Sequence, residues 1–153
     1  MAHADPELNP HPASAKAALR RAIQSLRDGL DPAERVRRSE VVLERVQGLP
    51  AFRQAHVVLG YASFGSELDT HPFLRAVLTG RGRLVLPRID RAARRLALHE
   101  VKDLESDLRA GTWGILEPVA ARCPAAAAAQ VDFVLMPGLV FDPDGGQIGR
   151  AHV

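Results

Sequence analysis

Three short apolar runs, at residues 56–61, 84–87 and 131–136, constrain the fold more than any other feature of this chain. Each has the length and apolar character of a buried strand, and residues 96–99 add another strand after a turn-like stretch. Helical patterns precede and separate the strands, and this alternation is typical of α/β proteins. The sequence therefore predicts a single α/β domain with an open, mostly parallel sheet, flanking helices in three layers, and sites at the strand ends.

Apolar residues recur at helical spacing over residues 15–30, from residue 32 to about 48, and over residues 73–78. Short polar residues, an early proline and a closing glycine are the usual signals for the ends of such helices. Glu34 after Asp31 also fits a capping box. The expected end signals are Ser14, Asp31, Pro32 and Thr70 at the start of a helix, and Gly48, Pro50 and Gly80 at its close.

Other segments lack this periodicity. Residues 1–12 are polar, carry three prolines and are expected to be flexible, so that the domain proper covers residues 13–147. Residues 116–118 are expected to break regular structure. The alanine run at residues 125–129 is interpreted as a surface helix or a linker.

The composition restricts the class of protein without selecting one. The chain has 153 residues, 46% of them apolar, which is enough for one domain with a hydrophobic core. A net charge of +2 suits an anionic small molecule as well as nucleic acid. The single cysteine excludes an internal disulfide, and neither a membrane span nor a secretion signal is visible. These features predict a cytoplasmic protein.

Lys16 and Arg20 form the first of four clusters that could carry chemistry. They lie one helical turn apart, so both side chains leave the same face and could reach one polyphosphate. The alternative is a solvated basic face shared with Arg21 and Arg27, and the pattern alone favours that alternative.

The second cluster is the strand exit at residues 61–70, which combines an aromatic residue, a glycine and two carboxylates. Asp69 and Thr70 are expected to cap the following helix. Glu67 has no such structural task in the sequence, and its carboxylate could accept two N–H donors from a polar heterocycle. A ligand role for Glu67 and a purely structural one are weighted equally.

The third cluster pairs Trp113, in a glycine-flanked loop, with Arg88 at the end of a predicted strand. The indole could stack on a flat ligand, or it could close one edge of the core. Arg88 could meet a carboxylate or a phosphate, or it could be a surface arginine.

The fourth cluster is the loop from Pro137 onward, where Gly145, Gly146 and Gly149 would let the backbone approach phosphate oxygens. Glycine turns are common, so this signal is weak alone. The six histidines show no metal-ligand spacing. Cys123 lies in no nucleophile motif and is expected to be inert.

Taken together, these segments resemble the 5-formyltetrahydrofolate cyclo-ligase family, whose members are also called 5,10-methenyltetrahydrofolate synthetases. The matching segments occur in the same order and spacing as in the family, and they extend over nearly the whole chain. They are residues 16–20, 61–70, 86–88, 113–118 and 132–142. Each segment is short, and their order and spacing make the match specific.

The resemblance implies an ATP-dependent ligase that forms a carbon–nitrogen bond, with ATP and Mg²⁺ as cofactors. It converts 5-formyltetrahydrofolate to 5,10-methenyltetrahydrofolate and releases ADP and phosphate. ATP phosphorylates the formyl oxygen, and the neighbouring nitrogen then closes onto the activated carbon, a reaction that depends on positioning and charge stabilisation. The residues implied in ATP binding are Lys16, Ala17, Ala18, Leu19, Arg20, Gln147, Ile148, Gly149 and Arg150. Those implied in substrate binding are Ala62, Glu67 and Trp113.

The chain departs from the family after Arg150, where Ala151, His152 and Val153 replace the continuation of the family. The family continues there into a glycine-rich stretch with two tyrosines and an aspartate, which closes over ATP and supplies a magnesium-binding carboxylate. Residues 148–153 are what a widely used short-read sequencing adapter encodes in one frame. We therefore expect a non-native tail on a truncated copy that is inactive or severely impaired and less stable.

Two other functions stay open. One is a folate- or nucleotide-binding α/β domain without turnover. The other is a nucleic-acid-binding module built on the arginine-rich N-terminal helices, although interleaved aromatics and a strong basic excess are absent from the sequence. The leading prediction is a monomer that binds 5-formyltetrahydrofolate and ATP, without a nucleic-acid or membrane partner.

Overall fold

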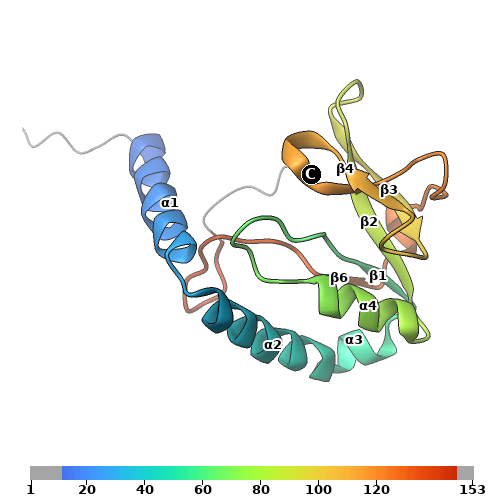
Figure 1. Cartoon of the computed structure of the whole chain (residues 1–153), viewed down its shortest axis with the longest axis horizontal. Helices are drawn as coiled ribbons and strands as arrows, with labels where there is room; N and C mark the ends of the chain where they lie inside the picture. The colour runs from blue at the N-terminus through green and yellow to red at the C-terminus, as the bar shows by residue number, and fades with distance from the viewer. Residues whose placement is uncertain (1–11, 148–153) are drawn as a thin grey trace, which may run out of the picture. The chain divides into compact units, whose positions relative to one another are not determined.

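The computed structural model of the chain describes residues 12–147, which fall into two compact units (Figure 1). The larger unit covers residues 30–137. The smaller unit contains residues 12–29 and residues 138–147.

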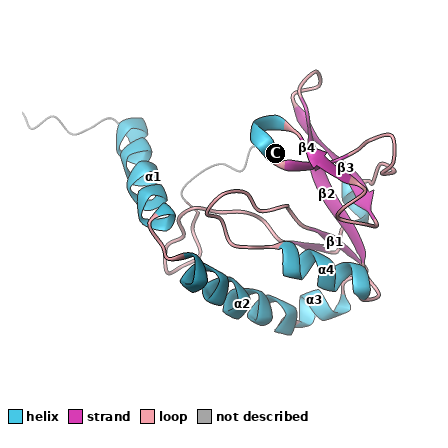
Figure 2. Cartoon of the chain, viewed as in Figure 1, coloured by secondary structure: helices cyan, strands magenta, loops and turns pink. Residues whose placement is uncertain are grey.

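A four-stranded sheet with the order β3-β2-β1-β6 forms the centre of the larger unit. β1 pairs in parallel with β2 and with β6, whereas β2 and β3 form an antiparallel hairpin (Figure 2). The strands are β1 (Val57–Leu59), β2 (Arg83–Asp90), β3 (Arg95–Val101) and β6 (Phe133–Val134). The mostly parallel α/β sheet predicted from the sequence is therefore confirmed.

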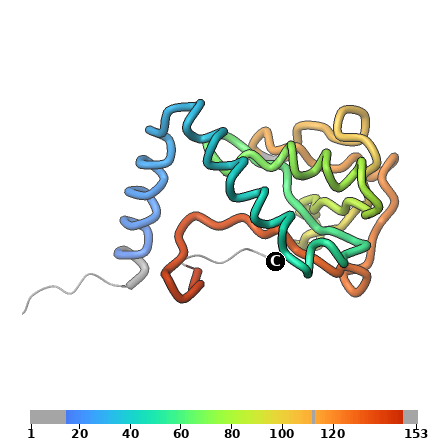
Figure 3. Tube along the Cα trace, turned by 90° about the horizontal axis from the view of Figure 1, so that it is seen from below, coloured from blue at the N-terminus to red at the C-terminus, as the bar shows by residue number. Residues whose placement is uncertain are grey.

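Helices and a second, two-stranded sheet complete the larger unit. α2 leads through the short α3 into β1, as the trace in Figure 3 shows. The helices are α2 (Pro32–Gly48), α3 (Pro50–Gln54) and α4 (His71–Thr79). The antiparallel pair β4 (Leu108–Ala110) and β5 (Leu116–Pro118) encloses the 3-10 turn η1 (Thr112–Gly114), and a second 3-10 turn, η2 (Ala128–Gln130), precedes β6.

One apolar core joins α4 to the sheet. Phe73 and Leu74 of α4 are fully buried against Leu84 and Leu86 of β2. Side chains alternate along a strand, so the equally buried Val85 lies on the opposite face. Both faces of this central strand are therefore excluded from water, which is usual for parallel sheets.

The signals predicted for the helix ends are only partly confirmed. Asp31 caps α2 as expected, but Glu34 accepts hydrogen bonds from Arg37 and Arg38 instead of completing a capping box. These hydrogen bonds lower the pKa of Glu34 to about 2. Pro50 begins α3 rather than only ending α2, because proline also suits the first position of a helix.

Thr70 occupies the N-cap position of α4, but its side chain caps nothing. The Oδ1 atom of Asp69 accepts the His71 N–H instead, at 3.1 Å. Gly80 ends the helix as predicted.

The strand predictions need three corrections. Residues 116–118, expected to be irregular, form β5, because they pair with the distant β4. The alanine run 125–129 contains no α-helix; Ala125 makes an isolated bridge with His99, and η2 follows. The last predicted strand, residues 131–136, is reduced to β6 at the edge of the sheet, where the side chain of Val134 is 47% exposed.

The smaller unit contains α1 (Pro12–Asp28). This helix begins before Ser14, so Ser14 is not its cap, and it ends before the predicted residue 30. The predictions for residues 1–11 and 148–153 lie outside the described residues. Between residues 12 and 147, no helix is both long and apolar enough to cross a membrane.

Candidate functional site

The carboxyl ends of three parallel strands meet at one edge of the larger unit's sheet. Leu59 of β1 pairs with Val85 of β2 and with Val134 of β6, so the segments after these residues emerge together. Gly60 begins the exit from β1, where an added Cβ would lie 2.8 Å from a methyl carbon of Leu74. The helix thus packs directly on the backbone of the exit. Open α/β sheets usually bind ligands at such an edge.

Hydrogen bonds between Ser63 and Thr70, together called the Ser63–Thr70 clasp, close the loop that follows β1. The Thr70 hydroxyl donates to the Tyr61 carbonyl at 2.7 Å and accepts the Ser63 N–H at 3.0 Å. In return, the Ser63 Oγ accepts the Thr70 N–H at 3.1 Å. Thr70 is fully buried, as is nearly all of Ala62, one of the residues predicted to bind substrate. These bonds hold both ends of the loop in place.

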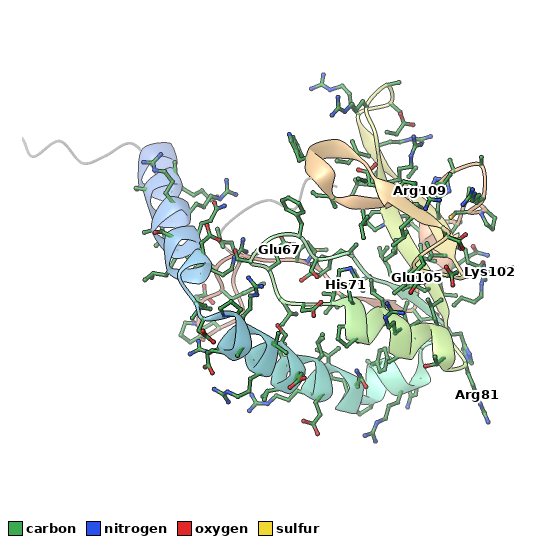
Figure 4. The ribbon with its side chains drawn as sticks, in the orientation of Figure 1. Glu67, His71, Arg81, Lys102, Glu105 and Arg109 are labelled. Atoms are coloured by element: carbon green, nitrogen blue, oxygen red, sulfur yellow. The ribbon has the colours of Figure 1, made fainter. Side chains whose placement is uncertain are left out.

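Glu67 lies at the tip of this loop (Figure 4), and it has a structural task that the sequence did not reveal. Its Oε2 accepts the Phe64 N–H at 3.0 Å, and its own N–H donates to the Phe64 carbonyl. Gly65 between them has a φ of +61°, which favours glycine in this tight turn. Within residues 12–147, Oε2 is the only carboxylate oxygen of Glu67 that accepts a hydrogen bond, so Oε1 is left for a ligand.

Trp113 stands at the tip of the β4–β5 hairpin and is 78% exposed. The prediction that it might close the edge of the core is therefore wrong. Its φ of +58° is strained for a non-glycine residue, and such strain is often found at ligand sites. A Cβ added to the neighbouring Gly114 would lie 3.5 Å from the Phe64 ring, so the hairpin tip lies next to the Glu67 loop. The structure thus brings the second and third clusters together.

Arg88 lies on β2, beyond the residues that pair with β1. It lines an open hollow of about 340 Å³ together with Gly111 and Glu117, which flank the Trp113 turn. Phe64 and Glu117 were not in the predicted binding set, whereas the sequence had already marked Arg88 as a residue that could meet a carboxylate or a phosphate. Phe64 and Glu117 lie inside matched segments, but only the folded hairpin shows that they are neighbours of the site.

The residues predicted to bind ATP lie in the smaller unit. Lys16, Ala17, Ala18, Leu19 and Arg20 are consecutive on α1, and all are exposed. Gln147 belongs to the same unit. Ile148, Gly149 and Arg150 lie outside the described residues.

The remaining titratable groups have structural explanations. Asp132 accepts the backbone N–H groups of Val57 and His56, each at 2.9 Å, and these bonds lower the pKa of its carboxyl group. Burial raises the pKa of the Cys123 thiol, in agreement with its predicted inertness. In the part of the chain that the structure describes, no three His, Cys, Asp or Glu side chains are grouped to hold a metal ion.

Comparison with known proteins identifies the family. The model of the 5-formyltetrahydrofolate cyclo-ligase family matches residues 12–152 of the chain. The chain therefore belongs to the 5-formyltetrahydrofolate cyclo-ligase family, as its sequence resemblance predicted.

Curated relatives agree with this assignment. The chain is 30% identical over 137 residues to the 5-formyltetrahydrofolate cyclo-ligase of Mycolicibacterium smegmatis, covering 88% of this chain and 70% of that protein. A mitochondrial 5-formyltetrahydrofolate cyclo-ligase of Arabidopsis thaliana is 25% identical over 149 residues. The alignment covers 88% of this chain but only 53% of the plant protein. The chain thus spans about half the length of that relative.

Solved structures show the same fold. The NMR structure of the Aquifex aeolicus 5,10-methenyltetrahydrofolate synthetase superposes with a TM-score of 0.77 at 31% identity. That superposition covers 89% of this chain and 67% of the other. The synthetase of Mycoplasma pneumoniae gives a TM-score of 0.66 at 16% identity, covering 90% of this chain and 72% of the other, a likeness of fold alone.

Proposed function

We propose that this chain binds 5-formyltetrahydrofolate at the Glu67 loop and the Trp113 hairpin, and that it catalyses the ATP-dependent closure of this substrate to 5,10-methenyltetrahydrofolate. The observation that carries the proposal is the proximity of Phe64 and Gly114, which places a carboxylate loop beside an exposed indole. The family relatives carry the name of this reaction.

In the proposed complex, the carboxylate of Glu67 accepts N–H donors from the polar ring of the substrate. Phe64 and Trp113, which are 49% and 78% exposed, supply apolar faces for the rest of the folate. Glu67 is already fixed by the Phe64 N–H, so binding does not have to order its carboxylate.

The reaction transfers the γ-phosphoryl group of ATP to the formyl oxygen, which releases ADP and makes the formyl carbon electrophilic. The neighbouring ring-side nitrogen then forms the new carbon–nitrogen bond, and the phosphorylated oxygen leaves as phosphate. We assign Lys16 and Arg20 to the ATP phosphates because their exposed cations lie one turn apart on α1. Magnesium would enter with ATP, since within residues 12–147 no three His, Cys, Asp or Glu side chains are grouped to hold it.

The test measures binding and turnover separately. Binding of 5-formyltetrahydrofolate should quench the fluorescence of Trp113, the only tryptophan, and turnover should produce the near-ultraviolet chromophore of the methenyl product with equimolar ADP. Glu67→Gln should weaken substrate binding about 10- to 100-fold, the range for a lost charged hydrogen bond. The exposed Glu44→Gln on α2 is the matched control and should bind like the parent chain.

Saturable binding that depends on Glu67, with methenyl product and ADP formed in equal amounts, would support the proposal. Saturable binding with no ATP-dependent product would favour a folate-binding domain without turnover. The proposal extends to a monomer acting in the cytoplasm, which chromatography and cell fractionation would test.

A further inference from the structure

Arg88 lies at the open end of an otherwise buried row of side chains. Residues along a strand alternate between faces, so Arg88 shares a face with Leu84 and Leu86, which belong to the core. Leu84 and Leu86 are buried, whereas Arg88, the next residue on this face, is half-buried and lines the hollow beside the β4–β5 hairpin. A cation held partly away from water costs desolvation energy unless something compensates it.

No such compensation exists among the described residues. The Arg88 side chain makes no hydrogen bond or ion pair there, although Asp90, Arg91 and Glu117 line the same hollow. Glu117 is also half-buried, and within residues 12–147 its side chain likewise has no hydrogen-bonded or ionic partner. An arginine and a glutamate that share a hollow without pairing present one donor group and one acceptor group to a ligand.

Gly111 shapes the wall of the hollow on the Glu117 side. An added Cβ at Gly111 would lie 2.5 Å from the Cδ of Glu117, so the glutamate side chain lies flat across this glycine. The Gly111 N–H donates to the Ile115 carbonyl at 2.7 Å, which closes the hairpin around Trp113. The position of Glu117 is therefore set by the same turn that displays the indole.

The hollow continues the proposed folate site. The Glu67 loop lies next to the hairpin at Phe64 and Gly114, and the base of the same hairpin forms the hollow at Gly111 and Glu117. A volume of about 340 Å³ is near the lower limit for ligand pockets, roughly 300 Å³, so it suits one end of a ligand rather than a whole folate.

We propose that this hollow binds the glutamate tail of the substrate, with Arg88 on a tail carboxylate and Glu117 on the adjoining amide N–H. The proposal rests on the folate-binding function proposed above. A folate carries a glutamyl group at the end opposite its polar ring. That group bears a carboxylate and an amide N–H on the same carbon, which matches one cationic donor and one anionic acceptor. The substrate class is thus a pteroylglutamate rather than a free pterin.

A phosphate of ATP is the competing anion for Arg88. The hollow is lined by two arginines, Arg88 and Arg91, and by two carboxylates, Asp90 and Glu117, so its lining is balanced in charge and suits a single carboxylate better than a multiply charged triphosphate. The hollow also adjoins the hairpin that displays Trp113, the proposed surface for the middle of the folate. The experiment nevertheless measures ATP affinity as a separate arm.

The test compares two ligands and three proteins by titration of the Trp113 fluorescence. The ligands are 5-formyltetrahydrofolate and 5-formyltetrahydropteroate, which lacks the glutamate. The proteins are the parent chain, Arg88→Met and the control Arg81→Met, which removes an exposed cation from the turn before β2 (Figure 4). The parent chain should bind the folate about tenfold more tightly than the pteroate, between the values for exposed and buried charged hydrogen bonds.

In Arg88→Met the folate should bind more weakly, so that the ratio of folate affinity to pteroate affinity falls from about 10 to about 1. The affinities for the pteroate and for ATP should not change. Arg81→Met should retain the parent preference. Equal losses for both folate ligands, or a loss confined to ATP, would overturn the assignment of the tail to Arg88. So would a parent chain that binds both ligands equally, a result that does not depend on the variant folding.

The outcomes also separate this proposal from the one it rests on. If the parent chain binds the pteroate and the folate alike, the tail site fails while folate-ring binding stands. If it binds neither ligand, the proposed function fails and the tail site fails with it. Arg88→Lys provides a second variant, which should keep part of the preference because it keeps the positive charge.

Discussion

Replacing Thr70 by valine tests whether the Ser63–Thr70 clasp holds the proposed substrate loop. Valine has nearly the shape of threonine, so the fully buried site loses a hydroxyl without gaining a cavity. The loop loses the bond to the Tyr61 carbonyl and the acceptor for the Ser63 N–H. Loss of the bond to the Tyr61 carbonyl costs about 1 kcal/mol, and leaving the Ser63 N–H without an acceptor costs about 1–3 kcal/mol. The free energy of unfolding should therefore fall by about 2–4 kcal/mol.

Urea denaturation followed by circular dichroism measures this loss directly. Domains of this size lose roughly 2–4 °C in melting temperature per kcal/mol, so Thr70→Val should melt roughly 4–16 °C below the parent chain. Thr70→Ser is the control, because it keeps the hydroxyl and removes only a methyl group, at a cost of about 1 kcal/mol. Affinity for 5-formyltetrahydrofolate should fall in Thr70→Val, since Ala62 and Glu67 lie inside the clasped loop.

The result that would refute this reasoning is a valine variant as stable as the serine variant. It would mean that the hydroxyl contributes no net stability and that packing alone positions the loop. A valine variant that is destabilised but binds folate normally would separate the two claims. The clasp would then stabilise the fold without controlling the site.

Three further outcomes follow from the larger unit. Gly60→Ala should lower the free energy of unfolding by about 1–3 kcal/mol, because its Cβ would meet Leu74 at 2.8 Å; chemical denaturation measures this. Backbone hydrogen bonds lower the pKa of Asp132 in the folded chain, so its contribution is present above about pH 4 and is lost as the pH falls through the lower folded pKa. Asp132→Asn should therefore flatten the loss of stability in acid, as unfolding at several pH values would show. Cys123 should react with a thiol reagent only after unfolding, because the thiol is buried and its pKa is raised.

The parts of the fold that the sequence predicted well are those in which local and tertiary preferences agree. The runs that became β1 and β2 are short and apolar, and both are buried on two faces, so burial is visible in their composition. The cap at Asp31 and the end at Gly48 follow from local hydrogen bonding and backbone preference. These signals need no information from distant residues.

The failures occur where a distant partner decides the structure. β5 pairs with β4, and the Leu116–Pro118 segment has no strand signal of its own. The run at residues 131–136 carries a strand pattern, but only Phe133 and Val134 align with β1 at the edge of the sheet. Thr70 carries the local signal of a cap, yet its hydroxyl bonds back to Tyr61. In each case a nonlocal contact overrides a local preference.

The site shows why a structural role and a ligand role for one residue need not exclude each other. The sequence left Glu67 evenly divided between the two, and the structure gives one oxygen of its carboxylate to the Phe64 N–H. That bond fixes the direction in which the other oxygen points, and a carboxylate already ordered loses less entropy when it binds a ligand. Glu117 is held differently, because its side chain packs across Gly111 and has no hydrogen-bonded partner among residues 12–147. A residue that stabilises its own loop, as Glu67 does, can therefore also be the residue proposed to meet the ligand.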